Sequence, residues 1–161
     1  MQGNTAVMFA FATGHSQDAS GFATADSSPR SVSTSPPAHA RYRVLLVDDD
    51  EKTLGLLRDI LANYPDISIV GEAGNGLEAV AMATTHNPDV ILMDITMPFL
   101  DGIEATHRIK TASPRTVVIS FAGQFVTRTY NAMRTAGASA FLCKSDAFAI
   151  HDTIRSVLGQ R

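Results

Sequence analysis

The 161-residue sequence contains no tryptophan and a single cysteine, Cys143. One cysteine cannot form an internal disulfide framework, and this usage is typical of a reducing compartment, so we expect a cytoplasmic protein. Because Cys143 falls in an apolar run, it is expected to be a small buried hydrophobic side chain rather than a reactive thiol.

The sequence also has no apolar run approaching the ~18 residues that a transmembrane helix needs. The apolar stretch at residues 6–12 has no Lys or Arg before it, which argues against a secretory signal. The 13 basic and 16 acidic side chains are mixed along the chain and give a net charge of -3. No basic strip indicates nucleic-acid binding by this chain alone, or binding to a membrane.

Residues 1–40 are dominated by Ala, Ser, Thr, Gly and Pro, unlike everything that follows. Such a composition cannot bury enough apolar surface to offset its ordering entropy, so the sequence predicts a disordered tail. A start codon assigned too far upstream is an equal alternative, and a tether or docking arm is a third. Residues 41–161 are predicted to form one domain.

From Arg41 onward, apolar runs alternate with segments of helical periodicity. Five β-α units in succession predict a three-layer α/β/α domain around a five-stranded parallel sheet. The expected strands are 43–47, 67–72, 90–94, 116–120 and 138–143. The expected helices follow each strand, with Asp50, Asn75, Asp101 and Ser145 or Asp146 as N-terminal caps, and with His86, His107 and His151 at surface positions.

The stretch Pro88–Gly102 (PDVILMDITMPFLDG) organises the domain. Its four apolar residues have no polar alternation, which is typical of a central strand covered on both faces. Asp94 closes this strand, and Asp101 with Glu104 can cap a following helix. Asp94 is therefore expected to face the crevice in which α/β sheets bind their ligands.

Polar side chains close the other strands as well. Asp48 and Asp49 follow the first, Ser120 ends the fourth and Lys144 follows the fifth. Parallel strands end at one edge of a sheet, so these groups are expected to converge with Asp94. Neighbouring carboxylates repel one another, which implies a divalent cation. Oxygen ligands favour Mg²⁺, or Mn²⁺, over zinc.

A hard cation, a lysine, a hydroxyl and one separate carboxylate suit phosphoryl transfer to that carboxylate. The cation and Lys144 would neutralise charge on the transferring group while Asp94 attacks in line. Ser120 would donate to a phosphoryl oxygen only once the group is in place, and so couple the chemistry to its loop.

The segments VDDDEKTLGLL, MDITMPFLDGIEA and GASAFLCKSD resemble the receiver domain of two-component response regulators over about residues 43–158. The resemblance implies the flavodoxin-like (βα)5 fold with strand order 2-1-3-4-5. It implies that Asp94 is the phosphoacceptor, that Asp48, Asp49 and the Thr96 carbonyl bind Mg²⁺, and that Lys144 pairs with the phosphoryl group. Ser120 and Phe141 would be the switch hydroxyl and aromatic.

The same resemblance implies partners. The phosphodonor would be a histidine kinase or a histidine phosphotransfer protein, and a downstream protein target would bind the fourth helix, fifth strand and fifth helix. A phosphorylation-dependent homodimer is compatible with it. The chain would then be a signalling protein rather than an independent enzyme.

Three departures keep alternatives open. Lys144-Ser145 resembles the NarL/FixJ-like subfamily, whose members usually continue into a helix-turn-helix domain, so a truncated DNA-binding regulator is one alternative. Bulky Phe121 follows the switch position, and the segment 120–137 is about two residues longer than the familiar spacing. These two features favour a second alternative, a phosphorylation-independent interaction module.

Overall fold

A computed structural model describes residues 41–124 and 126–159 of the chain. The tail predicted over residues 1–40 lies outside the described residues. Within them, strands and helices alternate as the apolar pattern predicts. The strands are β1 (Tyr42–Val47), β2 (Ile67–Ala73), β3 (Val90–Met93), β4 (Val117–Ala122) and β5 (Ala140–Cys143). The helices are α1 (Glu51–Leu61), α2 (Gly76–His86), α3 (Gly102–Ala112), α4 (Thr127–Ala136), the 3-10 helix η1 (Lys144–Ala149) and α5 (Ile150–Gly159).

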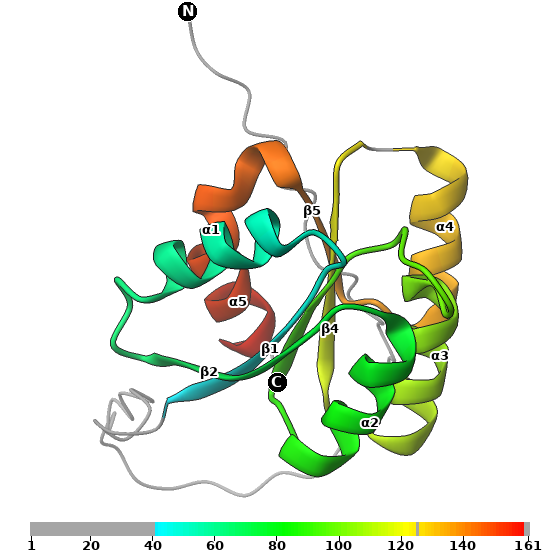
Figure 1. Cartoon of the computed structure of the whole chain (residues 1–161), viewed down its shortest axis with the longest axis horizontal. Coiled ribbons are helices and arrows are strands. Elements are labelled where there is room, and N and C mark those ends of the chain that lie inside the picture. Colours follow the sequence, from blue (N-terminus) through cyan, green and yellow to red (C-terminus); the bar gives the residue numbers. More distant parts are fainter. Residues whose placement is uncertain (1–40, 125, 160–161) are drawn as a thin grey trace, which may run out of the picture.

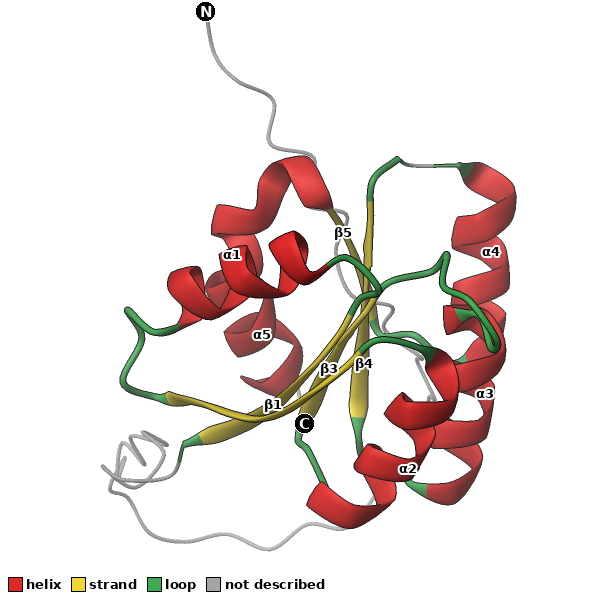
Figure 2. Cartoon of the chain, in the orientation of Figure 1, coloured by secondary structure: helices red, strands yellow, loops and turns green. Residues whose placement is uncertain are grey.

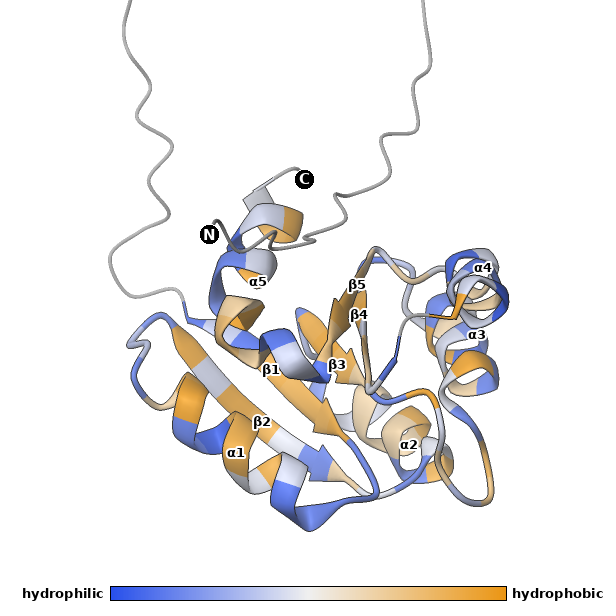
Figure 3. Ribbon diagram, turned by 90° about the horizontal axis from the view of Figure 1, so that it is seen from above, coloured by the Kyte–Doolittle hydropathy of each residue, from blue (hydrophilic) through white to orange (hydrophobic). Residues whose placement is uncertain are grey.

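The five strands form one parallel sheet in the order β2-β1-β3-β4-β5, which confirms the predicted fold. Helices α1 and α5 cover one face, and α2, α3 and α4 cover the other (Figure 1). All residues of β3 and β4 are buried, since helices lie on both sides of these central strands (Figure 2). Figure 3 accordingly shows the strands mostly in the colours of hydrophobic residues.

The predicted helix caps lie at the carboxyl edge of the sheet. The side chains of Asp50, Asn75 and Asp101 accept hydrogen bonds from backbone amides in the first turns of α1, α2 and α3. Each cap fixes the point at which the chain turns from a strand end into the next helix. The cap role predicted for Asp50 is therefore confirmed.

The prediction for the fourth strand was wrong at its end. Ser120 does not terminate β4, because the pairs Phe121 with Leu142 and Ala122 with Cys143 continue the ladder by two residues. Phe121 is buried in the cluster under α1 and α5, whereas Ala122 lies in the cluster under α2, α3 and α4. Side chains alternate along a strand, so Ser120 faces the same side as Ala122 and Phe121 points away from it.

The segment after β5 also differs from the prediction. A cap at Ser145 or Asp146 was expected to open the last helix, but the chain enters the 3-10 helix η1 directly at Lys144. The ammonium of Lys144 is held by two carboxylates, which keeps this turn close to the sheet. Cys143, expected to be buried, is partly exposed, and its thiol lies 3.5 Å from the Gly123 carbonyl oxygen.

His151 was expected at the surface and is instead buried at the start of α5. Its ring stacks on Tyr64, with centroids 3.8 Å apart, and its Nε2 lies 3.1 Å from Asp66 Oδ1. Tyr64 and Asp66 belong to the connection between α1 and β2, so the contact fastens the start of α5 to that connection. No helix among the described residues is long and apolar enough to cross a bilayer.

Candidate functional site

The site is built on the register of the central strands. Val47 pairs with Met93, so the next residues, Asp48 and Asp94, follow adjacent strand ends. The Asp94 amide continues this ladder with a hydrogen bond of 2.8 Å to the Val47 carbonyl. Both carboxylates are therefore positioned by the backbone of the sheet.

Lys144 joins these two carboxylates. Its Nζ lies 2.7 Å from Asp48 Oδ2 and 2.9 Å from Asp94 Oδ1. The side chain of Asp48 is fully buried, that of Asp94 is 7% exposed and that of Lys144 is 28% exposed. Asp48 Oδ2 has no well-directed hydrogen bond, and its short distance to the ammonium identifies an ion pair as its interaction. The structure thus brings together three of the predicted site residues.

Backbone groups hold the remaining carboxylate oxygens. The Asp50 amide donates to Asp48 Oδ1 at 3.0 Å, and the Thr96 amide donates to Asp94 Oδ2 at 2.9 Å. Each carboxylate is thereby fixed in orientation at both oxygens. Such fixed orientation lowers the entropy that a reaction at these oxygens would otherwise lose.

The charges at the site are not balanced. Burial raises the pKa of Asp94 above its ordinary value, and the Asp48 carboxylate contributes in the same direction, while the contacts with Lys144 and the Thr96 amide oppose the shift. Burial acts to lower the pKa of Lys144, but its close contacts with the Asp48 and Asp94 carboxylates outweigh burial and raise it. Because one ammonium faces two buried carboxylates, the group carries excess negative charge, which a further cation would offset.

Asp49 stands apart from the ion-paired group. It is exposed, and with Asp48 it lines an open groove of about 530 Å³ that also includes Glu51 and Glu72. Among the described residues, no three His, Cys, Asp or Glu side chains are arranged to hold a metal ion. The oxygen donors needed for Mg²⁺ are present at Asp48 and Asp49, and the unbalanced carboxylate charge fits a hard cation there.

Ser120 and Phe141 occupy adjacent strands beside this group. Ser120 pairs with Met93 on one side and with Phe141 on the other. The Ser120 hydroxyl is fully buried and has no hydrogen-bond partner within the described part of the chain. A buried polar group without a partner is unfavourable, so this hydroxyl fits a ligand that is not always present. The Phe141 ring is buried and lies 5.8 Å from the Tyr130 ring of α4.

Gly102 has a role that the sequence did not reveal. A Cβ atom at this position would collide with the Asp94 carbonyl oxygen, and the Gly102 amide donates to the Ile95 carbonyl at 2.9 Å. The first turn of α3 therefore packs directly against the backbone of Asp94. Its place one residue after the Asp101 cap suggested only a turn glycine.

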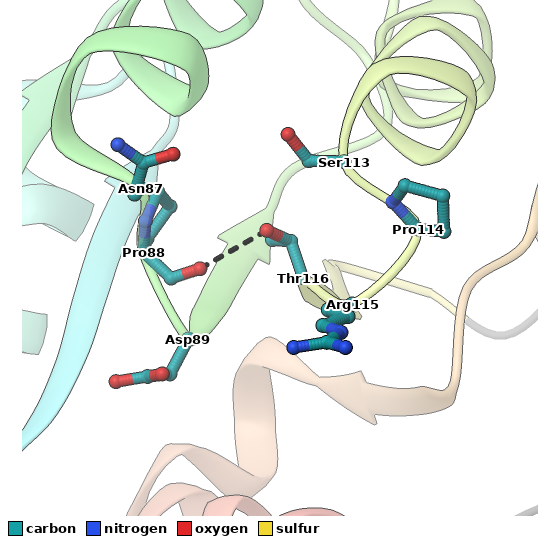
Figure 4. A pocket seen from close by; sticks show the side chains of 7 residues that line it. All are labelled: Asn87, Pro88, Asp89, Ser113, Pro114, Arg115 and Thr116. Atoms are coloured by element: carbon teal, nitrogen blue, oxygen red, sulfur yellow. Dashed lines mark hydrogen bonds between the residues drawn. The ribbon is translucent and has the colours of Figure 1, made fainter.

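A second hollow, of about 620 Å³, lies at the amino edge of the sheet, between the loops that precede β3 and β4 (Figure 4). There the Thr116 hydroxyl donates to the Pro88 carbonyl at 3.0 Å, and Asp89 accepts from the Arg43 amide at 2.9 Å. These contacts fasten the loop before β3 to the segment before β4 and to strand β1. The hollow is remote from the strand ends that hold Asp94.

The parallel sheet in the order β2-β1-β3-β4-β5, with two acids and a lysine at its carboxyl edge, defines a doubly wound α/β domain. The sequence model of the response regulator receiver domain matches residues 44–155, and the chain belongs to this family. The response regulator domain of Thermotoga maritima CheB is 36% identical, with a TM-score of 0.68 over 74% of this chain and 97% of that one. The CheX-CheY-BeF3-Mg complex from Borrelia burgdorferi matches with 27% identity and a TM-score of 0.66, over 73% of this chain and 89% of that one.

Curated relatives match only over part of their length. The transcriptional regulatory protein LiaR of Bacillus subtilis is 39% identical over 118 residues, which are 71% of this chain and 54% of LiaR. A protein-glutamate methylesterase/protein-glutamine glutaminase of Methanospirillum hungatei is 49% identical over 77 residues, which are 48% of this chain and 22% of the relative. The chain thus spans about half or less of these relatives.

Proposed function

We propose that this receiver domain accepts a phosphoryl group on Asp94 and signals by a change of conformation. The donor is a histidine kinase or a histidine phosphotransfer protein, and the phosphoacceptor unit spans residues 41–161. In this proposal the chain is a cytoplasmic signalling protein. Its only chemistry is to accept a phosphoryl group on its own carboxylate and to lose that group again by hydrolysis. Membership of the receiver family supports the assignment of the chain to two-component signalling.

The observation that carries the proposal is the bridge from Lys144 to Asp48 and Asp94. It puts a cation beside the one acid whose carboxylate is held at the end of the central strand. When Asp94 carries a phosphoryl group, the Lys144 ammonium can pair with a phosphoryl oxygen without leaving Asp48. Burial raises the pKa of Asp94 and the Asp48 carboxylate adds to the shift, so the ionised form is unfavourable there and a divalent cation would favour it.

In this proposal Mg²⁺, or Mn²⁺ in its place, would be held by Asp48, Asp49 and Asp94 together with the Thr96 carbonyl, although the three carboxylates are not gathered into a metal site in the part of the chain that the structure describes. The ion supplies charge neutralisation for the transferring group. The open groove beside Asp48 and Asp49 supports this assignment, because it lets a hydrated ion reach both carboxylates.

In the transfer, a carboxylate oxygen of Asp94 attacks the phosphorus atom in line with the donor nitrogen. The new P–O bond forms as the P–N bond to the donor imidazole breaks, and the electron pair leaves on that nitrogen, which is protonated from solvent. The Thr96 amide holds the second oxygen of Asp94 and so orients the attacking one. Hydrolysis of the acyl phosphate returns Asp94 to its starting form.

The switch would begin at Ser120. Its buried, unpartnered hydroxyl can donate to a phosphoryl oxygen on Asp94, and Phe141 on the neighbouring strand would follow. Because the Phe141 ring contacts Tyr130 of α4, a shift there would alter the face formed by α4, β5 and α5. We assign the downstream protein target, or a phosphorylation-dependent second copy, to that face.

Phosphorylation with acetyl phosphate in the presence of Mg²⁺ tests the proposal. Wild type should gain one phosphoryl group that hydroxylamine and alkali remove, and Asp94→Asn should gain none. Asp152→Asn, which removes an exposed carboxylate of α5, is the matched control and should label as wild type does. Labelling that survives in Asp94→Asn would eliminate Asp94 as the acceptor.

A phosphorylation-independent interaction module is the second candidate, since β4 and its loop depart from the expected geometry. Beryllofluoride with Mg²⁺ separates the two. The first candidate predicts shifts of the amide resonances of Phe141 and α4, and the second predicts an unchanged spectrum there. A third candidate is a regulator with an effector segment, such as one that binds DNA, as the name of the longer relative LiaR suggests for that protein. Genomic sequence downstream of Arg161 tests this candidate.

A further inference from the structure

Three consecutive aspartates follow β1, and the side chain of the third is bonded to the helix that comes next. The Oδ1 atom of Asp50 accepts from the Lys52 amide at 3.1 Å, and its Oδ2 atom accepts from the Thr53 hydroxyl at 2.9 Å. Both side-chain oxygens of Asp50 are thus directed into the first turn of α1. This arrangement separates Asp50 from Asp48 and Asp49, although the sequence presents the three as equal oxygen donors.

The backbone of Asp50, in contrast, reaches the candidate site. Its amide donates to Asp48 Oδ1 at 3.0 Å, while the Lys144 ammonium lies 2.7 Å from Asp48 Oδ2. The Asp48 side chain is fully buried, so bulk water cannot replace the amide if it moves away. The Asp50 amide therefore fixes the orientation of the Asp48 carboxylate.

The position of this amide depends on the cap at the start of α1. Asp50 has the extended conformation of a cap residue, with φ -95° and ψ 108°, and its carbonyl oxygen accepts from the Leu54 amide at 3.1 Å. Its two side-chain hydrogen bonds hold it in that conformation. The bond from Thr53 comes from a side chain, so a substitution can remove it without changing a backbone group.

The other two predicted caps are built differently. Asn75 and Asp101 each accept from the backbone amide three residues further on. Asp50 accepts instead from an amide two residues on and from a hydroxyl, and its own amide donates to a buried carboxylate of the site. A helix cap needs only a bond to an amide of the first turn, so the additional contacts indicate a task beyond the capping of α1.

We propose that Asp50 and Thr53 are positioning residues, which hold the Asp48 carboxylate in the orientation that binds the divalent cation. The inference rests on the Mg²⁺ assignment in the proposed function. Loss of a group that orients a metal ligand typically lowers metal affinity by about 10–100-fold. Thr53 acts at one further remove, through Asp50, so its contribution is smaller.

Titration of the full chain with magnesium chloride, followed by amide resonances and without a phosphodonor, measures the dissociation constant for the ion. Asp50→Ala and Asp50→Asn remove the same charge, but only asparagine keeps an oxygen that can accept from the helix, so the ratio of their constants isolates the cap. Thr53→Val removes the hydroxyl, and Thr53→Ser retains it. Asn75→Ala, which removes the cap of α2 at the same edge of the sheet, is the matched control.

We expect Asp50→Ala to bind Mg²⁺ about tenfold more weakly than Asp50→Asn. Thr53→Val should bind about threefold more weakly than wild type, and Thr53→Ser should restore the affinity. Asn75→Ala should lose about 4 °C in melting temperature, as loss of a cap does, yet bind Mg²⁺ as wild type does. The Mg²⁺ concentration for half-maximal labelling by acetyl phosphate should rise in each variant by the same factor as the dissociation constant.

Equal Mg²⁺ affinities of Asp50→Ala and Asp50→Asn would overturn the inference and leave the proposed function standing. So would a Thr53→Val variant that binds as tightly as wild type. An Asn75→Ala variant that binds as weakly as Asp50→Ala would show that loss of any cap at this edge loosens the site, and would also overturn the inference. A wild type that binds no Mg²⁺ and that acetyl phosphate does not label would refute the proposed function and the inference together.

Discussion

Replacement of Lys144 by methionine perturbs the centre of the site while keeping the length of its aliphatic chain. It leaves Asp48, fully buried, and Asp94, 7% exposed, without their shared cation. Removal of one partner of a fully buried ion pair costs about 3–5 kcal/mol. The Lys144 side chain is 28% exposed, so we reduce the expected loss in free energy of unfolding to about 2–3 kcal/mol.

Urea unfolding followed by circular dichroism measures this loss, which corresponds to roughly 10 °C in melting temperature. The double variant Lys144→Met/Asp94→Asn should recover about 1–2 kcal/mol, because it removes one of the two carboxylates left facing each other. Lys52→Met, which removes the same charge from an exposed position on α1, is the control and should change stability by less than about 0.5 kcal/mol.

The loss in Lys144→Met should depend on pH with a definite sign. The pKa of Asp94 is already raised, and loss of the ammonium shifts it further in that direction. A carboxyl whose pKa is raised in the folded state makes folding less favourable as the pH rises from its ordinary value through the raised one. The deficit relative to wild type should therefore be smaller at about pH 4 than at about pH 7. A Lys144→Met variant as stable as wild type, or one that Asp94→Asn does not rescue, would refute the ion-pair account of this site.

Three further predictions concern the support of the site and its fold. Gly102→Ala should lower the free energy of unfolding by about 3 kcal/mol or more and slow labelling by acetyl phosphate, because its Cβ would displace the Asp94 backbone; calorimetry and labelling rates measure both. His151→Leu should lower stability in urea unfolding by about 1–2 kcal/mol, since it loses the Nε2 contact with Asp66 while keeping bulk against Tyr64. Asp94→Asn alone should unfold at higher urea than wild type at neutral pH, because the raised pKa makes the ionised carboxylate unfavourable, and the advantage should vanish in acid.

The positions of Asp48 and Asp94 could be predicted because they follow apolar runs that only central strands explain. Parallel strands in register then bring the two acids together without any information on side-chain contacts. The helix caps at Asp50, Asn75 and Asp101 depend on three-residue spacings and were equally accessible. These features are local or follow from the topology.

What the sequence could not show depends on contacts between distant segments. A hydroxyl after an apolar run suggested that β4 ends at Ser120, but pairing with β5 extends the strand to Ala122. His151 is separated from Asp66 by 85 positions in the sequence, and Tyr64 is as distant, so nothing in its own helix indicated burial. The grouping of the acids predicted a divalent cation, yet only the structure reveals that Lys144 bridges two of them. The left-handed conformation of Phe99 follows from the hydrogen bonds that fix its loop.

Direct location of the modified residue tests the central claim most sharply. Reduction of the acyl phosphate with borohydride converts the modified aspartate to homoserine, which peptide sequencing by mass spectrometry can place. The account predicts homoserine at position 94 of protein treated with acetyl phosphate and Mg²⁺, and none without Mg²⁺. Homoserine at position 48 or 49, or at no position, would contradict it.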